Sequence, residues 1–131
     1  MNSLVLFDSD VSIDVLRRGI IAENLLTSFG GIGPLGISVI SRMETIRGCL
    51  NAEVQQRAEK LLRRFQVIAL DEGISRRADE LVTRYYLSHN LAIADALIAA
   101  TALEFDLPLL SENQRDFRFI PGLQLLSYPS A

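Results

Sequence analysis

Five short apolar runs alternate with stretches that have the spacing of helices, and this alternation constrains the fold more than any other feature of the sequence. The runs are Leu4–Phe7, Gly36–Ile40, Gln66–Leu70, Pro108–Ser111 and Gln124–Ser127. Continuous apolar runs of this length suit strands that are covered on both faces, as the strands of a parallel sheet are. The sequence therefore predicts an α/β fold, a three-layer α/β/α sandwich around a central, mostly parallel five-stranded sheet with right-handed crossovers.

The segments between the runs supply the helices that such a sheet needs. We expect helices at Val11–Arg18, Ile20–Ser28, Ser41–Cys49, Ala52–Phe65, Ser75–Leu87 and Ala92–Phe105. The chain has 131 residues, of which 49% are hydrophobic. This length and composition suit one core, so a single domain over residues 1–131 is expected.

The composition also bounds the environment and the partners of the chain. A single cysteine, Cys49, excludes an intrachain disulfide, and no signal peptide or membrane-spanning run is apparent, so we expect a soluble cytoplasmic protein without a membrane anchor. The net charge is −3, whereas nucleic-acid binders usually have a basic surface. Chemistry on a nucleic acid would therefore need a bound divalent cation, with arginines making outer contacts to phosphate.

Four acidic residues follow predicted strands or begin a predicted helix. Asp8 directly follows the first run, Glu44 lies in the first turn after the second, and Asp116 comes shortly after the fourth. Asp95 lies in the first turn of the helix that begins near Ala92. In an open parallel sheet, ligands bind beyond the carboxyl ends of the strands, where the strand order switches. We therefore expect these four carboxylates to converge at one edge of the sheet.

Most of these acids also have a purely structural explanation. Ser41 and Glu44 have the spacing of a capping box, which taken alone explains Glu44 better than catalysis does. Asp8 or Asp10 could cap the first helix. Asp116 could be an ordinary loop acid paired with an arginine, and such exposed pairs contribute little to stability.

Asp95 is harder to explain as a structural residue. From position 92 to position 103 the only polar side chains are Asp95 and Thr101, so this helix should be buried. A carboxylate on a buried helix must be paired, protonated or bound to a metal. Crowded carboxylates repel one another and their pKa values rise unless a cation is present. Oxygen ligands suit Mg²⁺ or Mn²⁺, whereas Zn²⁺ is disfavoured because His89 and Cys49 form no ligand motif.

Four segments of the chain together resemble the motifs of PIN-domain ribonucleases. Leu6–Val11 looks like the opening motif, in which an Asp ends the first strand, and Ile37–Glu44 is similar to the second motif, a hydroxyl-rich strand end followed by Glu. Ala94–Ala102 is close to the VapC-type pattern and is the most specific match. Leu110–Phe117 resembles the closing motif, Thr-x-Asn-x-x-Asp-Phe. The motifs have the order and spacing of the family.

The resemblance implies an Mg²⁺-dependent endoribonuclease that acts as the toxin of a type II toxin–antitoxin pair. It implies Asp8 and Asp95 as the principal metal ligands, with Glu44 and Asp116 completing the site directly or through water. The attacking group would be a metal-activated water, which Glu44 could orient or deprotonate.

Three further residues would support the site that this resemblance implies. Ser111 stands where the family usually has Thr, which keeps the hydroxyl group. Asp10 stands where Asn is usual and adds a negative charge near the metal. Family members differ over whether the position of Asn113 or that of Asp116 carries the last ligand, so this assignment stays open.

The resemblance also implies partners besides the RNA substrate. A small cognate antitoxin would wrap the toxin with its C-terminal segment, and the exposed apolar residues of Val11–Phe29 and Ala52–Phe65 could form the receiving groove. A homodimer or a toxin–antitoxin hetero-oligomer is expected.

Two alternatives come from other classes of protein. Phe7-Asp8-Ser9-Asp10-Val11 also fits the opening of a haloacid-dehalogenase-like phosphatase, but that mechanism needs a lysine and a later acidic pair, and Lys60 is the only lysine. A non-catalytic PIN-fold binding module is the other alternative. The inert module would have lost its acids, whereas all four positions are filled here.

Overall fold

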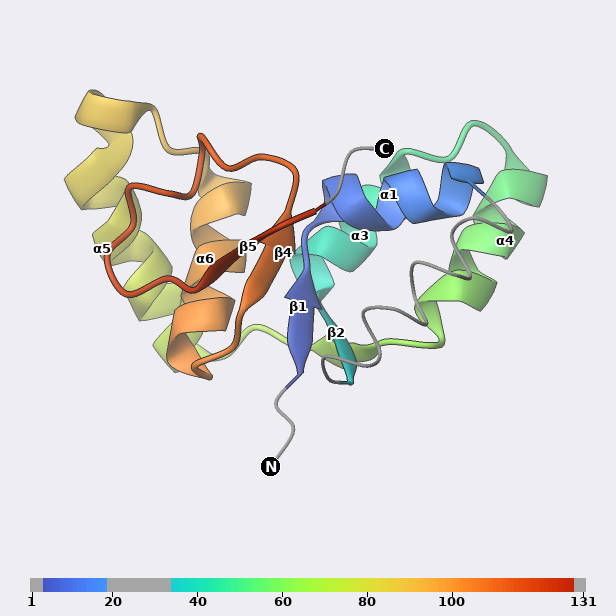
Figure 1. The fold of residues 1–131 in the computed structure, drawn as a ribbon, viewed down its shortest axis with the longest axis horizontal. Helices are drawn as coiled ribbons and strands as arrows, with labels where there is room; N and C mark the ends of the chain where they lie inside the picture. Colours follow the sequence, from blue (N-terminus) through green and yellow to red (C-terminus); the bar gives the residue numbers. More distant parts are fainter. Residues whose placement is uncertain (1–3, 19–33, 129–131) are drawn as a thin grey trace.

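A sheet of five parallel strands lies at the centre of the computed structural model, which describes residues 4–18 and 34–128 (Figure 1). The strand order is β3-β2-β1-β4-β5, and every neighbouring pair is parallel. The strands are β1 (Val5–Phe7), β2 (Leu35–Ser38), β3 (Gln66–Ile68), β4 (Leu109–Ser111) and β5 (Leu125–Ser127). All five predicted strands are present, so the predicted α/β fold is confirmed.

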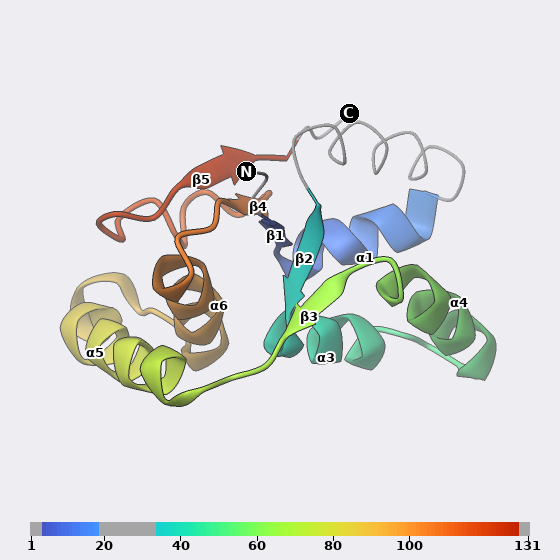
Figure 2. The same cartoon turned by 90° about the horizontal axis from the view of Figure 1, so that it is seen from below.

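Helices cover both faces of this sheet (Figure 2). They are α1 (Ser9–Arg18), α3 (Val39–Arg47), α4 (Ala52–Leu62), α5 (Glu72–His89) and α6 (Ile93–Glu104). The predicted helix Ile20–Ser28 lies outside the described residues. Across residues 4–18 and 34–128, every helix falls short of the length or apolar content that crossing a bilayer requires.

Side chains that point alternately to the two faces of the sheet divide the hydrophobic core into two clusters. On β1, Leu6 packs into a cluster with residues of α5 and α6, while Val5 and Phe7 pack into a second cluster with residues of α1 and α4. Successive side chains of a strand point to opposite faces, which is why one strand serves both clusters. The apolar runs of β1, β2 and β4 therefore correspond to strands that are largely buried on both faces, whereas the edge strands β3 and β5 are partly exposed.

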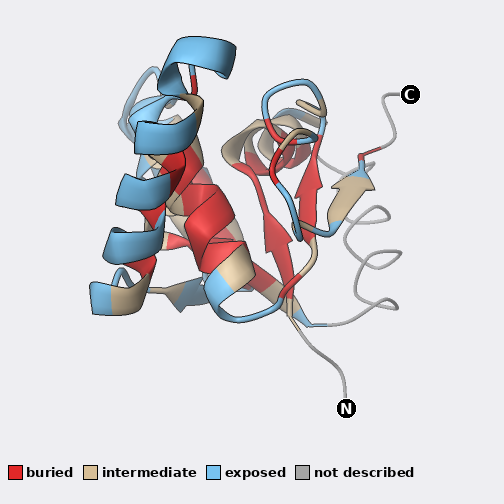
Figure 3. Ribbon diagram, turned by 90° about the vertical axis from the view of Figure 1, so that its left-hand side faces the viewer, coloured by how far each residue is buried: buried red, intermediate tan, exposed pale blue. Residues whose placement is uncertain are grey.

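Helix α6 is the most deeply buried helix of the described chain (Figure 3). Its residues Ala96, Ile98, Ala99, Ala100, Thr101 and Ala102 are all buried. Thr101 satisfies its hydroxyl group by donating to the carbonyl of Leu97, one turn earlier, at 2.8 Å. The prediction of a buried helix that carries Asp95 near its beginning is confirmed.

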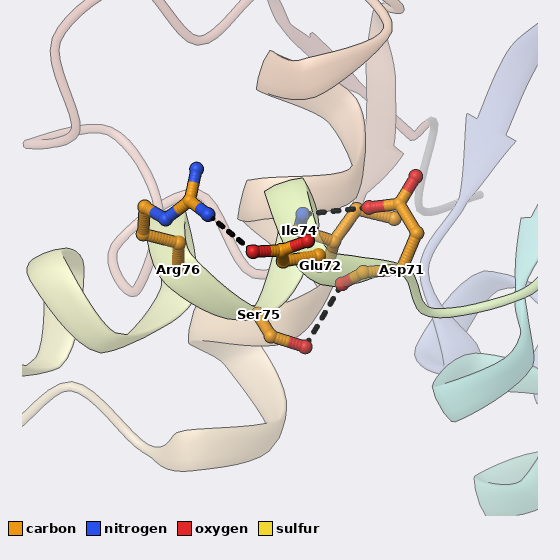
Figure 4. Close-up of polar contacts among 5 residues, drawn as sticks. All are labelled: Asp71, Glu72, Ile74, Ser75 and Arg76. Carbon is orange, nitrogen blue, oxygen red and sulfur yellow. Dashed lines mark hydrogen bonds and ion pairs between the residues drawn. The ribbon is translucent and has the colours of Figure 1, made fainter.

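Helix α5 begins three residues earlier than Ser75, where the sequence predicted its start. The side chain of Asp71 accepts a hydrogen bond from the backbone N–H of Ile74 at 2.8 Å, and the Asp71 carbonyl accepts one from Ser75 Oγ at 2.9 Å (Figure 4). An ion pair of 2.7 Å between Arg76 and Glu72 supports the same turn. Asp71 is therefore the N-cap that starts the helix.

The beginning of α3 corrects a second expectation. The sequence suggested that the strand continued to Ile40 and that Ser41 capped the helix with Glu44 as its partner. In the structure Ser38 is the N-cap, because its hydroxyl oxygen accepts a hydrogen bond from the backbone N–H of Ile40 at 3.1 Å. The capping-box explanation of Glu44 is therefore wrong, and Glu44 lies in the second turn of α3 with its side chain free for another role.

The strand order reverses between β1 and β4. From β1 the chain moves outward through β2 to β3, and it then returns to place β4 and β5 on the other side of β1. Ligand sites of open parallel sheets lie at the carboxyl ends of the strands at such a reversal. Asp8 directly follows β1 and Ser111 ends β4, so both residues lie at this point.

Candidate active site

Asp8 is the buried carboxylate at the centre of the site. Only 5% of its surface is exposed. Its Oδ1 accepts a hydrogen bond from the backbone N–H of Ser9 at 2.8 Å, and its Oδ2 accepts one from Ser111 Oγ at 2.7 Å. Burial, together with the charges of Asp10 and Asp95, raises the pKa of Asp8 to about 7 against the opposing effect of these two hydrogen bonds.

Asp10 adds a second carboxylate beside Asp8. It lies in the first turn of α1, and burial raises its pKa. Its Oδ2 lies 3.3 Å from Ser111 Oγ, but its buried Oδ1 has no hydrogen-bond partner among the residues that the structure describes. An unpartnered buried oxygen of a carboxylate is costly unless a cation or water fills the gap.

Glu44 is connected to the same cluster through Ser9. The Ser9 hydroxyl donates to Glu44 Oε1 at 2.9 Å, while the Ser9 backbone N–H donates to Asp8. Next to this contact, the hydroxyl groups of Ser12 and Thr45 lie 2.6 Å apart and join α1 to α3. Ser9 thus donates hydrogen bonds to both Asp8 and Glu44 and fixes the position of one carboxylate relative to the other.

Asp95 approaches the cluster from the first turn of α6. Ala92, the N-cap of this helix, provides no side-chain hydrogen bond, so Asp95 is the acidic group nearest the positive end of the helix dipole. Burial, together with the charges of Asp116, Glu44 and Asp10, raises the pKa of Asp95 to about 6. These electrostatic effects mean that Asp95 shares the same region with the other acids.

Asp116 lies at the exposed rim of the site. Its Oδ2 accepts a hydrogen bond from Asn113 Nδ2 at 2.6 Å, and its backbone N–H donates to Asn113 Oδ1 at 3.3 Å. The Asn113 backbone N–H in turn donates to Ser111 Oγ at 2.9 Å. The alternative explanation of Asp116, as a loop acid paired with an arginine, does not match its contacts among the described residues, where Asn113 is its partner.

The structure therefore brings together the residues that the sequence singled out at one edge of the sheet. Among the described residues, however, no three acidic, histidine or cysteine side chains are arranged as a ready-made metal cage. Mg²⁺ needs no such cage, since it keeps several waters and binds through one or two carboxylates. The all-oxygen donor set, the unpartnered Oδ1 of Asp10 and the raised pKa values of Asp8 and Asp95 fit a hard divalent cation.

The sequence interpretation did not include Ser9 in the site. Its contact with Asp8 could have been predicted from the sequence, because a residue directly after Asp8 can donate its backbone N–H to that side chain. The contact with Glu44 joins residues 35 positions apart, and it depends on how α1 crosses α3. That crossing angle has no signature in the spacing of the residues.

Known proteins are similar to this chain in sequence. The family model of the PIN domain matches residues 5–123. Ribonuclease VapC10 of Mycobacterium tuberculosis (strain ATCC 25618 / H37Rv) is 43% identical over 122 residues, which are 92% of this chain and 91% of that protein.

Solved structures extend the comparison to three dimensions. A toxin–antitoxin complex from Klebsiella pneumoniae has a chain that is 30% identical with a TM-score of 0.75, covering 93% of this chain and 95% of that one. VapBC2 from Rickettsia felis, bound to a DNA fragment from its promoter, has a TM-score of 0.82 at 21% identity, covering 97% of this chain and 100% of that one. The second likeness concerns the fold alone.

Proposed function

This chain belongs to the PIN-domain family, and on that premise we propose that it is a metal-dependent endoribonuclease, a hydrolase of RNA phosphodiester bonds, acting as the toxin of a toxin–antitoxin pair. The observation that carries the proposal is the buried carboxylate Asp8, whose pKa burial raises to about 7, beside Asp10 and within the field of Asp95. Relatives that are named ribonucleases or come from toxin–antitoxin complexes support the same function.

The proposed metal is Mg²⁺, with Mn²⁺ as the alternative. Asp8 and Asp95 would be its principal ligands, and Glu44 and Asp116 would bind it directly or through water. Once bound, the cation would lower the pKa of a water molecule and neutralise charge that develops on the phosphoryl oxygens. The burial of these ligands supports a bound cation. In the metal-free protein, burial raises the pKa values of Asp8 and Asp95 because no nearby positive charge stabilises their ionised forms, and a divalent cation would supply that charge.

The protein groups around these ligands have distinct roles in this proposal. Ser111 orients Asp8 by donating its hydroxyl hydrogen to Oδ2, and Asn113 orients Asp116 by donating an amide hydrogen from Nδ2 to its Oδ2. Ser9 holds Oε1 of Glu44, which leaves Oε2 to accept a proton from the attacking water. A nucleophile formed in this way attacks the phosphorus atom, and the bond from phosphorus to the leaving oxygen of the RNA breaks.

Removing either principal ligand tests the proposal. Asp8→Asn and Asp95→Asn should abolish Mg²⁺-dependent cleavage of labelled RNA while circular dichroism shows that the fold is kept. Asp79→Asn is the matched control, since Asp79 is an exposed carboxylate on α5 outside the cluster. Full activity of Asp8→Asn or Asp95→Asn would remove the carboxylate mechanism. An inert binding module would give no cleavage with the unmodified chain.

The phosphatase alternative gains no support from the site. Lys60, the only lysine, is exposed on α4 and makes none of the hydrogen bonds of the carboxylate cluster. A phosphate-ester assay run beside the RNA assay separates the two reactions.

The proposed partner is a cognate antitoxin, and we place its binding groove on the surface of α1 and α4. A cavity of about 330 Å³ lies there, lined by apolar side chains of Ile13, Leu16, Leu50 and Val54 with Arg17 and Arg57. Such a groove suits a helical or extended segment that inserts apolar side chains. Growth arrest caused by this chain should be relieved when a short neighbouring reading frame is expressed with it, and absence of relief would count against the pairing.

The assembly and its location complete the proposal. We expect a homodimer of this chain or a hetero-oligomer with the antitoxin, and sedimentation of the purified protein tests this expectation. A monomer at every concentration would contradict the dimer. An RNA substrate and an antitoxin are met in the cytoplasm, which is where we place the protein.

A further inference from the structure

A stack of aromatic rings at the end of α5 has no role in the function described so far. The imidazole of His89, the last residue of α5, lies parallel to the ring of Phe119, with centroids 4.0 Å apart and planes at 15°. Tyr85 contacts both rings: the centroid of its ring lies 5.0 Å from that of Phe119 and 5.8 Å from that of His89. We call the three residues Tyr85, His89 and Phe119 the ring stack.

The outer ring of this stack is exposed and held in place. Tyr85 and Phe119 are half-buried and pack against the hydrophobic core, whereas His89 is exposed. Ser88 Oγ lies 2.8 Å from His89 Nδ1, a hydrogen bond that limits rotation of the imidazole. A flat, exposed ring that rests on a packed aromatic neighbour is a preformed surface for another planar group.

The ring stack lies at the same end of the molecule as the carboxylates. Helix α5 ends at His89, and α6 begins at Ile93 with Asp95 in its first turn. Phe119 follows Asp116 by three residues, so their Cα atoms are at most about 11 Å apart. The end of α5, the beginning of α6 and the first part of the connection from β4 to β5 lie at the upper edge in Figure 1.

Two arginines lie next to Asp116 and Phe119 in the sequence and could supply the charge that an RNA backbone needs. Arg115 and Arg118 flank Asp116 and Phe119, are exposed, and take part in no ion pair within the described ranges. Proteins bind single-stranded nucleic acid by stacking its bases on aromatic rings and pairing its phosphates with cationic side chains.

We propose that the exposed face of His89, supported by Phe119, is a stacking platform for an unpaired base of the RNA substrate beside the cleaved bond. The proposal rests on the nuclease function and adds a base-binding subsite to it. Stacking would add an attraction for RNA that does not itself require a positive net charge, which this chain, at −3, lacks. Because every base has a flat face, the platform would bind unpaired RNA of any sequence and would not select one particular base.

Binding in EDTA tests the platform without cleavage. We would measure the affinity of a short, labelled, mixed-sequence single-stranded RNA by fluorescence anisotropy, and compare it with an abasic strand of the same length. His89→Ala should weaken binding to the RNA by about 10-fold, since loss of base stacking costs about 1–3 kcal/mol, and should leave binding to the abasic strand unchanged. His89→Phe should bind the RNA as the unmodified chain does.

Tyr86→Ala is the matched control, because Tyr86 is an exposed aromatic residue of α5 outside the ring stack. The proposal is overturned if His89→Ala binds RNA like the unmodified chain, if the abasic strand loses as much affinity, or if the unmodified chain binds no RNA. Addition of Mg²⁺ then tests the nuclease function separately. An unmodified chain that binds RNA through His89 but never cleaves it would contradict the nuclease and support the platform.

Discussion

Replacing Asp8 by Asn should stabilise the metal-free protein at alkaline pH while it abolishes catalysis. Asp8 is 5% exposed, and burial raises its pKa from the ordinary value of 3.8 to about 7. Between these two values the folded chain holds a proton that the unfolded chain releases. The stability from this proton is therefore complete below about pH 4 and is lost as the pH rises through 7.

The size of the effect follows from the shift. A rise of about three pH units corresponds to about 4 kcal/mol, because each unit is about 1.4 kcal/mol. About two of these units lie between pH 5 and pH 7. Ionisation of Asp8 should therefore lower the free energy of unfolding of the unmodified chain by about 3 kcal/mol from pH 5 to pH 8. Asp8→Asn removes this loss, although its amide can accept only one of the two hydrogen bonds that Ser9 and Ser111 donate to Asp8.

Urea unfolding in EDTA at pH 5 and at pH 8 measures this difference. The free energy of unfolding of Asp8→Asn, relative to the unmodified chain, should rise by about 3 kcal/mol from the lower to the higher pH. The exposed Asp79→Asn should show no such change. Mg²⁺ at 100 times its dissociation constant should restore about 2.7 kcal/mol to the unmodified chain at pH 8, and less to Asp8→Asn.

A relative stability that is equal at both pH values would refute the reasoning. It would mean that Asp8 is ionised in the folded metal-free protein at pH 5, and hence that other groups already neutralise its charge. The unpartnered Oδ1 of Asp10 would then need an explanation other than a missing cation.

Three further predictions concern separate parts of the molecule. Ser9→Ala should lower kcat for RNA cleavage by about 10-fold, since a hydrogen bond to a charged group contributes about 1.5–3 kcal/mol. Ser9→Thr keeps the hydroxyl group and should retain activity. Equal rates for the unmodified chain, Ser9→Ala and Ser9→Thr would exclude a role of Ser9 in positioning Glu44. Asp71→Ala should lower the free energy of unfolding by about 1 kcal/mol through loss of the α5 N-cap, without altering RNA cleavage, which urea titration and a parallel activity assay would check. Dialysis against EDTA should abolish cleavage and either Mg²⁺ or Mn²⁺ should restore it, whereas cleavage that persists in EDTA would rule out the metal mechanism.

The sequence was sufficient to predict the sheet because all five strands are short apolar runs, and the three central strands β2, β1 and β4 are largely buried on both faces. A strand of this kind is a short apolar run with no polar alternation, and every such run became a strand. The same reasoning misplaced the beginning of α3. Val39 and Ile40 are β-branched and apolar, so they look like strand residues, but Ser38 caps the helix and includes them in it.

The candidate site was predictable where position along the chain determines position in the sheet. Asp8 and Asp95 lie at a strand end and at a helix beginning, and both places follow from the pattern of apolar residues. Contacts between side chains were not predictable in this way. The bond from Ser9 to Glu44 and the stacking of His89 on Phe119 depend on how separate elements cross, and periodicity carries no information about that.

The bond between Ser111 and Asp8 joins residues 103 positions apart, and β4 must insert beside β1 before it can form. During synthesis, the first acid leaves the ribosome long before the segment that orients it. A partly made chain would therefore carry the opening motif without a working site. Cleavage would begin only after β4 has been synthesised and paired with β1, so every shorter chain would be inactive.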